Sequence, residues 1–278
     1  MQWYWIVVLA VTFALTAEAQ WVRYPTKGAP RKPDGVVDMT AKAPRTREGK
    51  PDFSGVWHGQ TSSREEMKRL FGEHTGDNEL PGMEITTISK YAINLFLDVK
   101  PEDVPIRPRA AEVQKVRLEK GGENGLECQP YGIPLATLLS EYHKIVQTPD
   151  LMLILLELDN TMRQVYLDGR KMEADPNPAW EGHSTGHWEG ATLVVETNGF
   201  NDKTWLDIVG HPHSDKLKVT ERYRRRDFGH MDVEMTFDDP VMYTRSFKVT
   251  IPYLLQPDTD ILEYVCVENE KDKVHARP

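Results

Sequence analysis

Two glycine-bordered segments hold four of the nine histidines in the chain. The first contains His183 and His187, and the second contains His211 and His213, followed by Asp215. Imidazole and carboxylate groups are common ligands of divalent metals, and a His-x-His pair on an extended chain can direct both rings to one side. The sequence therefore predicts either a divalent-metal site at His211, His213 and Asp215, or histidines that hydrogen-bond the backbone of their loops.

A carboxylate interrupts an apolar face in the segment 217–226. Alternate residues there read Leu217, Val219, Glu221 and Tyr223, so Glu221 is expected on the buried side of a strand. Burial of an unpaired carboxylate is costly, and Arg163, which shares an apolar face with its own neighbours, is the predicted partner. Two roles stay open for this pair: an acid-base set for catalysis, or a structural ion pair inside the fold.

Further histidines and several polar or aromatic residues complete the candidate site. His143 and His230 each begin a predicted strand, where an imidazole could act as a general base near neutral pH. The candidate catalytic residues are Glu221, His143, His183, His187, His230 and Arg163. The candidate substrate-binding residues are Tyr166, Trp188, Asn198, Asn201 and Tyr223. The sequence requires no cofactor, and a divalent metal is the one cofactor that its histidine segments would allow.

Several enzyme signatures are missing from the sequence. It contains no Gly-x-Ser-x-Gly elbow, no His-Glu-x-x-His pair, no phosphate-binding glycine loop and no dinucleotide fingerprint. The enzyme classes that depend on these motifs are therefore disfavoured.

The elements that must position these residues are mostly strands. Short apolar or alternating runs separated by turn pairs predict strands at 143–148, 151–158, 162–167, 186–188, 192–197, 217–226, 230–237, 247–254 and 261–268. No helix is expected between them, so the sequence predicts a mainly β protein, an antiparallel up-and-down β-barrel, with a sandwich as the alternative. Helical spacing at 63–71 and 110–119 predicts short helical insertions before the meander.

The N-terminal region is expected to be a targeting segment followed by an arm. Residues 1–19 are apolar and end in a small-x-small pattern, which predicts a signal peptide and a periplasmic or secreted protein. No basic residue precedes the apolar run, so an uncleaved anchor is the alternative. Residues 20–51 are rich in proline and basic residues and predict an extended arm. Residues 52–278 are expected to form one barrel domain with a helical insertion at about 62–120.

Charge and cysteine content limit the partners of the protein. The formal net charge is −9, and it is −8 without residues 1–19, which disfavours nucleic acid as a partner. The expected partner is a small molecule, without stable membrane insertion after cleavage, and the oligomeric state stays open. The two cysteines, Cys128 and Cys266, are predicted to form a disulfide in an oxidising compartment, with two buried thiols as the alternative.

Two stretches resemble known groups of proteins. The triplet Gly55-Val56-Trp57 ahead of an antiparallel meander resembles the opening of lipocalin-like barrels, and Trp57 is expected to plug one barrel end. The region 128–269 is similar to a group of uncharacterised exported bacterial proteins, through stretches such as Gly186-His-Trp-Glu-Gly and Gly210-His-Pro-His-Ser-Asp. This resemblance implies a shared domain and no particular activity.

The sequence favours an extracytoplasmic enzyme that acts on a small molecule in a barrel pocket. Histidine and carboxylate groups would perform hydrolysis, elimination or isomerisation, with a lean towards a hydrolase or lyase. The alternative is a lipocalin-like carrier that binds a lipophilic or aromatic molecule without catalysis. A third hypothesis, an envelope interaction protein, would instead require an exposed apolar patch.

Overall fold

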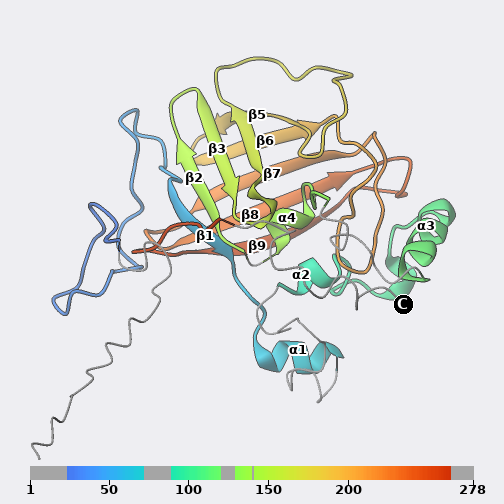
Figure 1. Cartoon of the computed structure of the whole chain (residues 1–278), viewed down its shortest axis with the longest axis horizontal. Helices are drawn as coiled ribbons and strands as arrows, with labels where there is room; N and C mark the ends of the chain where they lie inside the picture. The colour runs from blue at the N-terminus through green and yellow to red at the C-terminus, as the bar shows by residue number, and fades with distance from the viewer. Residues whose placement is uncertain (1–23, 72–88, 120–128, 140, 264–278) are drawn as a thin grey trace, which may run out of the picture.

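The protein is a closed nine-stranded β-barrel with helices gathered at one end (Figure 1). The structure is a computed structural model and describes residues 24–71, 89–119, 129–139 and 141–263. Its strands are β1 (Gly55–Gly59), β2 (His143–Gln147), β3 (Leu151–Leu156), β4 (Met162–Tyr166), β5 (His183–Glu189), β6 (Thr192–Asn198), β7 (Lys218–Arg225), β8 (His230–Asp238) and β9 (Phe247–Leu255). Each strand pairs with the next, and β1 pairs with β9 to close the barrel.

One pair of neighbouring strands runs parallel. Strands β4 and β5 pair in parallel through Val165 with Ser184 and Tyr166 with Thr185, whereas every other pair in the barrel is antiparallel. The prediction of a purely antiparallel barrel is therefore wrong at this point. A parallel pair needs a long connection, and the 16 residues between Tyr166 and His183 cross from one barrel end to the other.

Every second side chain of the strands points inward, and these side chains fill the inside of the barrel. Along β8 the burial alternates residue by residue, and its inward side chains Met231, Val233, Met235 and Phe237 are all at most 1% exposed. Strand β7 alternates in the same way, and Glu221 lies on the inner face as its spacing predicts. The inner faces of the strands form one continuous apolar core that also contains Trp57.

The helices precede the meander or sit at its start. They are α1 (Arg64–Phe71), α2 (Lys90–Ile93), α3 (Pro108–Glu119) and α4 (Leu135–Leu138), with 3-10 turns η2 (Pro101–Asp103) and η3 (Leu158–Asn160). Helices α1 and α3 lie in the two segments that the sequence predicts to be helical. Helix α4 is buried along its whole length, and the hydroxyl of Tyr253 donates to the carbonyl of Thr137. It therefore packs against β9.

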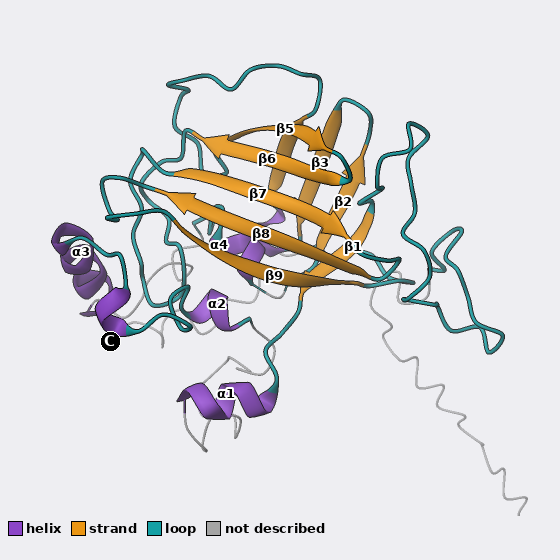
Figure 2. Cartoon of the chain, turned by 180° about the vertical axis from the view of Figure 1, so that it is seen from behind, coloured by secondary structure: helices purple, strands orange, loops and turns teal. Residues whose placement is uncertain are grey.

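The two ends of the barrel differ in what covers them (Figure 2). We call the end where β5 and β7 begin and β6 and β8 end the loop end, and helices α2 and α3 lie on that side. We call the opposite end the arm end, because residues 24–51 pack there. Trp57 is fully buried near the arm end, and the Arg225 guanidinium lies 4.8 Å from its ring centroid.

The arm contacts the turn before β8. The amides of Phe228 and Gly229 donate to the carbonyls of Ala41 and Met39 at 2.7 and 2.8 Å. Residues 24–51 contain two isolated bridges and, within that range, no helix or strand. The arm is thus held by backbone hydrogen bonds to the barrel and adds no strand to it.

Some expectations fall outside the described residues. The predicted signal peptide at residues 1–19 and both cysteines, Cys128 and Cys266, lie there. Residues 261–263 form no strand, and the rest of the predicted strand at 261–268 is also outside the described part. Among the described helices, none has the length and apolar character needed to cross a membrane.

Candidate functional site

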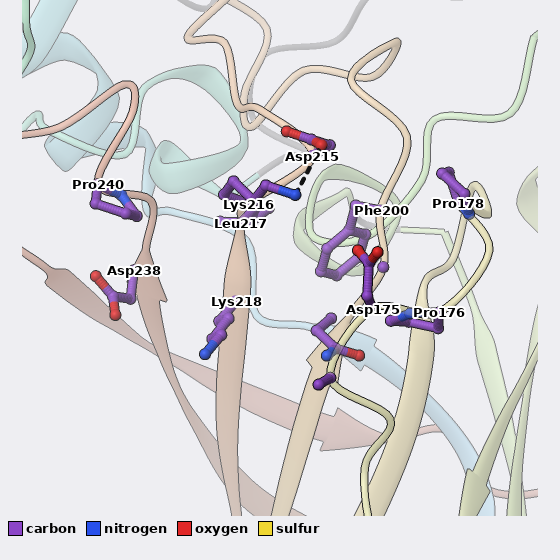
Figure 3. A pocket seen from close by; sticks show the side chains of 13 residues that line it. Asp175, Pro176, Pro178, Phe200, Asp215, Lys216, Leu217, Lys218, Asp238 and Pro240 are labelled. Atoms are coloured by element: carbon purple, nitrogen blue, oxygen red, sulfur yellow. Dashed lines mark ion pairs between the residues drawn. The ribbon is translucent and has the colours of Figure 1, made fainter.

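A pocket of about 350 Å³ opens at the loop end of the barrel (Figure 3). It lies among residues 174–178, 198–200, 215–218 and 238–240, which belong to the long β4–β5 connection and to the ends of β6, β7 and β8. We call it the strand-end pocket. Its volume is at the small end of the range for ligand sites, so the matching ligand is a small molecule.

A polar atom without a partner lies at this pocket. Asn198, at the end of β6, lines the pocket and is only 9% exposed. Its Nδ2 donates to the carbonyl of Glu173 at 2.8 Å, which fixes the orientation of the amide. Its Oδ1 is buried and accepts no hydrogen bond from the protein. An unsatisfied buried acceptor costs about 1–3 kcal/mol. Less than 1 Å² of this oxygen is accessible, so it lies behind the pocket wall and not on its open surface.

Five charged side chains surround the same pocket. Three are carboxylates, Asp175, Asp215 and Asp238, and two are ammonium groups, Lys216 and Lys218. Lys216 and Asp215 form an ion pair at 3.1 Å, and a hydrogen bond and charge attraction from Asp215 raise the pKa of Lys216. Figure 3 shows Asp175 and Asp238 on different walls of the pocket. The pocket therefore presents both signs of charge, with a net charge of −1 from these five groups.

The segment 199–217, which we call the rim segment, holds a buried carboxylate-imidazole pair on its inner side. His211 Nδ1 donates to Asp207 Oδ2 at 2.6 Å, and both side chains are at most 6% exposed. Asp207 also accepts from the amides of His211 and Leu95, so the rim segment is tied to the residues that follow α2. This bond assigns the proton of His211 to Nδ1 and leaves Nε2 as a base in the neutral ring.

A second imidazole in the rim segment binds a hydroxyl group. The Thr204 hydroxyl and His213 Nε2 are 2.6 Å apart, and His213 Nδ1 lies 3.1 Å from the carbonyl of Ser214. Because a carbonyl only accepts, Nδ1 carries the proton, and the Thr204 hydroxyl donates to Nε2. Burial lowers the pKa of His213, which keeps the ring neutral. A hydroxyl next to a neutral imidazole is the arrangement of an activated nucleophile.

Phe200 connects the strand-end pocket to the buried imidazoles. Its side chain is fully buried beside the pocket, and its ring meets the His213 ring edge-on with centroids 6.0 Å apart. Asp239 supports the same region, since it accepts from the amide and hydroxyl of Ser214. The rim segment thus borders the pocket on one side, and on its other side it holds the two buried pairs Asp207–His211 and Thr204–His213.

The predicted pair Arg163–Glu221 is present inside the barrel. The guanidinium donates to both carboxylate oxygens, from Nη1 to Oε1 at 3.0 Å and from Nη2 to Oε2. Tyr223, Ser184 and Thr197 complete this network with hydrogen bonds of 2.8 to 3.1 Å. Arg163 is 1% exposed and Glu221 is fully buried, and the attraction of Glu221 raises the pKa of Arg163 despite burial. This geometry is that of a closed structural ion pair.

The other predicted catalytic histidines lie apart from one another. His143 is buried, and its Nε2 donates to the carbonyl of Ala136 in α4 at 3.2 Å. His183 is exposed and donates to the carbonyl of Asn177. His187 is exposed beside Glu189, with 3.6 Å between their closest atoms. His230 binds Asp227 in the turn at the arm end. The structure does not bring these four rings to one site.

Of the predicted substrate-binding residues, one lines the strand-end pocket, namely Asn198. Tyr166 stacks on the Arg170 guanidinium at 3.6 Å, Asn201 accepts from the amide of Lys203, and Tyr223 binds Glu221 in the core. Trp188 lies at the arm end, where it lines a different pocket of about 470 Å³ and stacks on Phe53.

The predicted metal ligands do not converge. His211 binds Asp207, His213 binds Thr204 and Ser214, and Asp215 is exposed and pairs with Lys216. Within the described residues, no group of three or more histidine, cysteine, aspartate or glutamate side chains is arranged to hold a metal ion. The alternative expectation was that loop histidines hydrogen-bond the backbone. His183 does so with the carbonyl of Asn177, and His213 does so with one of its two ring nitrogens, at the carbonyl of Ser214.

Sequence reasoning missed several residues of this region. Thr204, Asp207 and Asp239 are buried polar groups, and Asp175 belongs to the connection whose path was not foreseen. The spacing of Asp207 and His211, four residues apart with Gly210 between them, is a signal for a turn that brings both side chains together. Nothing in the sequence alone places Asp175 beside Asn198, because that depends on the parallel pairing of β5.

Comparison with known protein families, with characterised proteins and with solved structures finds no match to this chain. The fold and the site therefore define its class: a closed, mixed, nine-stranded β-barrel with a small charged pocket at the loop end.

Proposed function

We propose that this protein binds a small polar molecule in the strand-end pocket and does so outside the cytoplasm. The observation that carries the proposal is the pocket itself, about 350 Å³ at the loop end, with five charged side chains around it. The extracytoplasmic location rests on the sequence of residues 1–19 alone.

The make-up of the pocket supports a binding role. Its walls combine proline rings, such as Pro176 and Pro178, with a few charged groups, while Phe200 and Leu217 lie fully buried behind them. Small-molecule sites have this composition, with mostly apolar walls that exclude water and a few polar groups that fix the ligand. A lipophilic carrier would place its ligand inside the barrel, but the inner face there carries packed core side chains and the Arg163–Glu221 pair.

A pocket-filling variant tests the binding role. Ala174 is exposed and lines the pocket, so Ala174→Trp should fill part of it without disturbing the core. Ala191→Trp, in the exposed β5–β6 turn at the opposite end, is the matched control. We expect saturation-transfer NMR with a panel of amino acids, amines, organic acids and sugars to detect a ligand for the native protein and Ala191→Trp, and none for Ala174→Trp. Equal signals from all three proteins would refute this site.

A hydrolytic enzyme is the second candidate, and the Thr204–His213 hydrogen bond favours it. In this scheme Thr204 Oγ attacks the carbonyl carbon of an ester, and its proton passes to His213 Nε2. His213 then protonates the leaving alcohol, and water later releases the acid from Thr204. Asp207 and His211 would supply a second acid-base pair beside it.

Acyl transfer from 4-nitrophenyl acetate tests this candidate. The enzyme hypothesis predicts a burst of nitrophenolate and an acetyl group on Thr204, found by peptide mass spectrometry. Both should be lost in Thr204→Val and kept in Thr220→Val, whose side chain lies on the outer face of β7. Native protein that shows no acetylation of Thr204 would leave binding as the function.

A further inference from the structure

We propose that the arm docks the protein onto an anionic membrane surface, and that the turn at residues 32–36 is the part that enters the lipid. This inference concerns the arm end of the barrel and is independent of the strand-end pocket. It rests on three features of residues 24–51 together: their charge, the exposure of two apolar side chains, and the hydrogen bonds that order the turn.

The arm is basic although the protein as a whole is acidic. Residues 24–51 contain seven basic and three acidic side chains, so the net charge of the arm is +4, against −9 for the whole chain. One of the basic groups, Arg31, pairs with Asp258 at 2.6 Å. Four others are exposed and have no ion-pair partner among the described residues: Lys27, Lys32, Lys42 and Arg47. The arm therefore presents a positive surface to the solvent.

The same segment carries the two most exposed large apolar side chains of the described residues. Val36 is 59% exposed and Tyr24 is 58% exposed. The next residue, Val37, is only 7% exposed and packs in the hydrophobic core, so the chain directs Val36 outward from a fixed neighbour. Apolar side chains beside cations are typical of segments that lie at a membrane surface. There the cations meet anionic headgroups, and the apolar groups enter the boundary of the acyl chains.

Hydrogen bonds order the turn at residues 32–36. The amide of Lys32 donates to the carbonyl of Val36, and the amide of Gly35 donates to the carbonyl of Lys32, both at 2.9 Å. The carboxylate of Asp34 accepts from the amide of Val36 at 3.0 Å. Because the turn is already ordered, insertion of Val36 into lipid costs little further conformational entropy.

The arm is tied to the barrel on both sides of this turn. Asp258, after β9, accepts from the amide of Thr26 at 2.8 Å and from the Arg31 guanidinium at 2.6 Å, and the amide of Gly229 donates to the carbonyl of Met39. Figures 1 and 2 show the loops of the arm projecting beyond the arm end, away from the strands. Docking through the arm would therefore orient the whole barrel, with the loop end and its strand-end pocket facing away from the membrane.

A soluble polyanion fits the arm less well than a membrane does. Its charges would attract the exposed lysines in the same way. It offers no apolar phase, however, so Val36 and Tyr24 would stay exposed to water in such a complex. A bilayer with anionic lipids satisfies both the cations and the apolar side chains.

Flotation with lipid vesicles tests the inference on the full chain, after any leader has been removed by its host. We expect binding to vesicles of equal parts phosphatidylglycerol and phosphatidylcholine to be at least about tenfold stronger than binding to phosphatidylcholine alone. Salt at about 1 M should remove most of this binding, because it shortens the screening length to about 3 Å.

A charge variant and a matched control locate the binding. The variant replaces three lysines of the arm: Lys27→Gln, Lys32→Gln and Lys42→Gln. The control changes the net charge equally at three exposed lysines outside the arm: Lys100→Gln, Lys115→Gln and Lys171→Gln. We expect the arm variant to bind phosphatidylglycerol vesicles at least about tenfold more weakly than the native protein, and the control to bind as the native protein does.

A second pair of variants tests the insertion of the turn. Val36→Ser should weaken binding to phosphatidylglycerol vesicles by about fivefold, because it removes the apolar group that enters the lipid. Val116→Ser, at a side chain of α3 that is 40% exposed, should bind as the native protein does. Circular dichroism and thermal melts confirm that each variant is folded.

Three results would overturn the inference. The first is a native protein that binds neither kind of vesicle or binds both equally, and the second is equal binding by the two lysine variants. The third is native binding by Val36→Ser together with release from the vesicles by inorganic polyphosphate, which would make the arm a polyanion site. None of these results bears on the strand-end pocket, which Ala174→Trp tests separately.

Discussion

Single residues in the barrel interior show how a buried charge can be structural and still look catalytic. Arg163 and Glu221 are each other's partner at both carboxylate oxygens, and Tyr223, Ser184 and Thr197 satisfy the remaining groups. The strand spacing of the sequence identifies both members of this pair. It does not show that neighbouring side chains enclose them completely, because enclosure depends on closure of the barrel.

Removal of one member of this pair should destabilise the protein strongly. Glu221→Gln keeps the shape of the side chain but leaves the Arg163 charge buried without its partner. We expect the free energy of unfolding to fall by about 3–5 kcal/mol in urea titrations. The double variant Arg163→Met with Glu221→Leu should cost less than the two single variants together.

Glu196→Gln is the control for this experiment, because Glu196 is exposed on β6 and its loss should change stability by less than about 0.5 kcal/mol. A Glu221→Gln protein as stable as the native one would show that the ion pair does not stabilise the barrel.

His143 should make stability depend on pH. Burial lowers its pKa to about 4 from the ordinary value of 6.5. Between these two values the unfolded chain takes up a proton that the folded protein cannot, so stability is complete above about pH 6.5 and is lost as the pH falls towards 4. At pH 4.5 the loss from His143 is about 2–3 kcal/mol relative to pH 7.5.

Urea titrations of native protein, His143→Gln and His187→Gln at pH 7.5 and 4.5 measure this effect. His143→Gln should lose less stability on acidification than the native protein, and His187→Gln, whose ring is exposed, should behave like the native protein. The same acid-induced loss in all three proteins would assign the pH dependence to other groups.

At the scale of elements, the connection between β4 and β5 decides where the candidate site lies. Its 16 residues carry the chain from the arm end to the loop end, so β5 enters parallel to β4 and residues 174–178 reach Asn198. The turn pairs of the other strands predict the rest of the meander well, because each is local in sequence. A long connection does not give such information even though the Asp168-Gly169 turn pair lies at its start, and the strand-end pocket could not be foreseen for this reason.

The arm should be displaced by one added methyl group. A Cβ at Gly229 would lie 2.6 Å from Met39 Cε and 2.9 Å from the Met39 carbonyl oxygen, which is closer than real Cβ atoms approach. We expect Gly229→Ala to break the hydrogen bonds that hold the arm and to expose residues 24–51 to trypsin, while circular dichroism of the barrel stays unchanged.

Gly190→Ala is the control, because a Cβ at Gly190 meets no atom within 4 Å, of the arm or of any other segment. Its positive φ of 62° adds strain only in the local β5–β6 turn. If trypsin cleaves the arm at the same rate in native protein and Gly229→Ala, the contact with Met39 does not hold the arm in place.

At the scale of the whole molecule, the residues whose side chains could bind a ligand or perform catalysis lie at both barrel ends. The strand-end pocket and both buried imidazole pairs lie at the loop end, whereas Trp188 and His230 lie at the arm end. The sequence does not reveal this division, because alternation in strands says which face a residue takes and not which end of a closed barrel it reaches.

The surface of the molecule bears on the remaining hypotheses. Large exposed apolar side chains of the described residues are spread over the arm, α3, β2, β4 and the stretch after β9. This distribution differs from the continuous patch that an envelope interaction protein would need. The net charge of −9 keeps nucleic acid a disfavoured partner, and that expectation stays a prediction.

The most direct test of the strand-end pocket is a titration of ¹⁵N-labelled protein with the panel of amino acids, amines, organic acids and sugars, followed by two-dimensional NMR. The account predicts saturable shifts of the Asn198 side-chain amide and of the backbone amides at 174–175 and 215–218, because these groups surround the ligand. Shifts confined to the arm end, around Gln147 and Trp188, would contradict it, and so would a spectrum that does not change with any member of the panel.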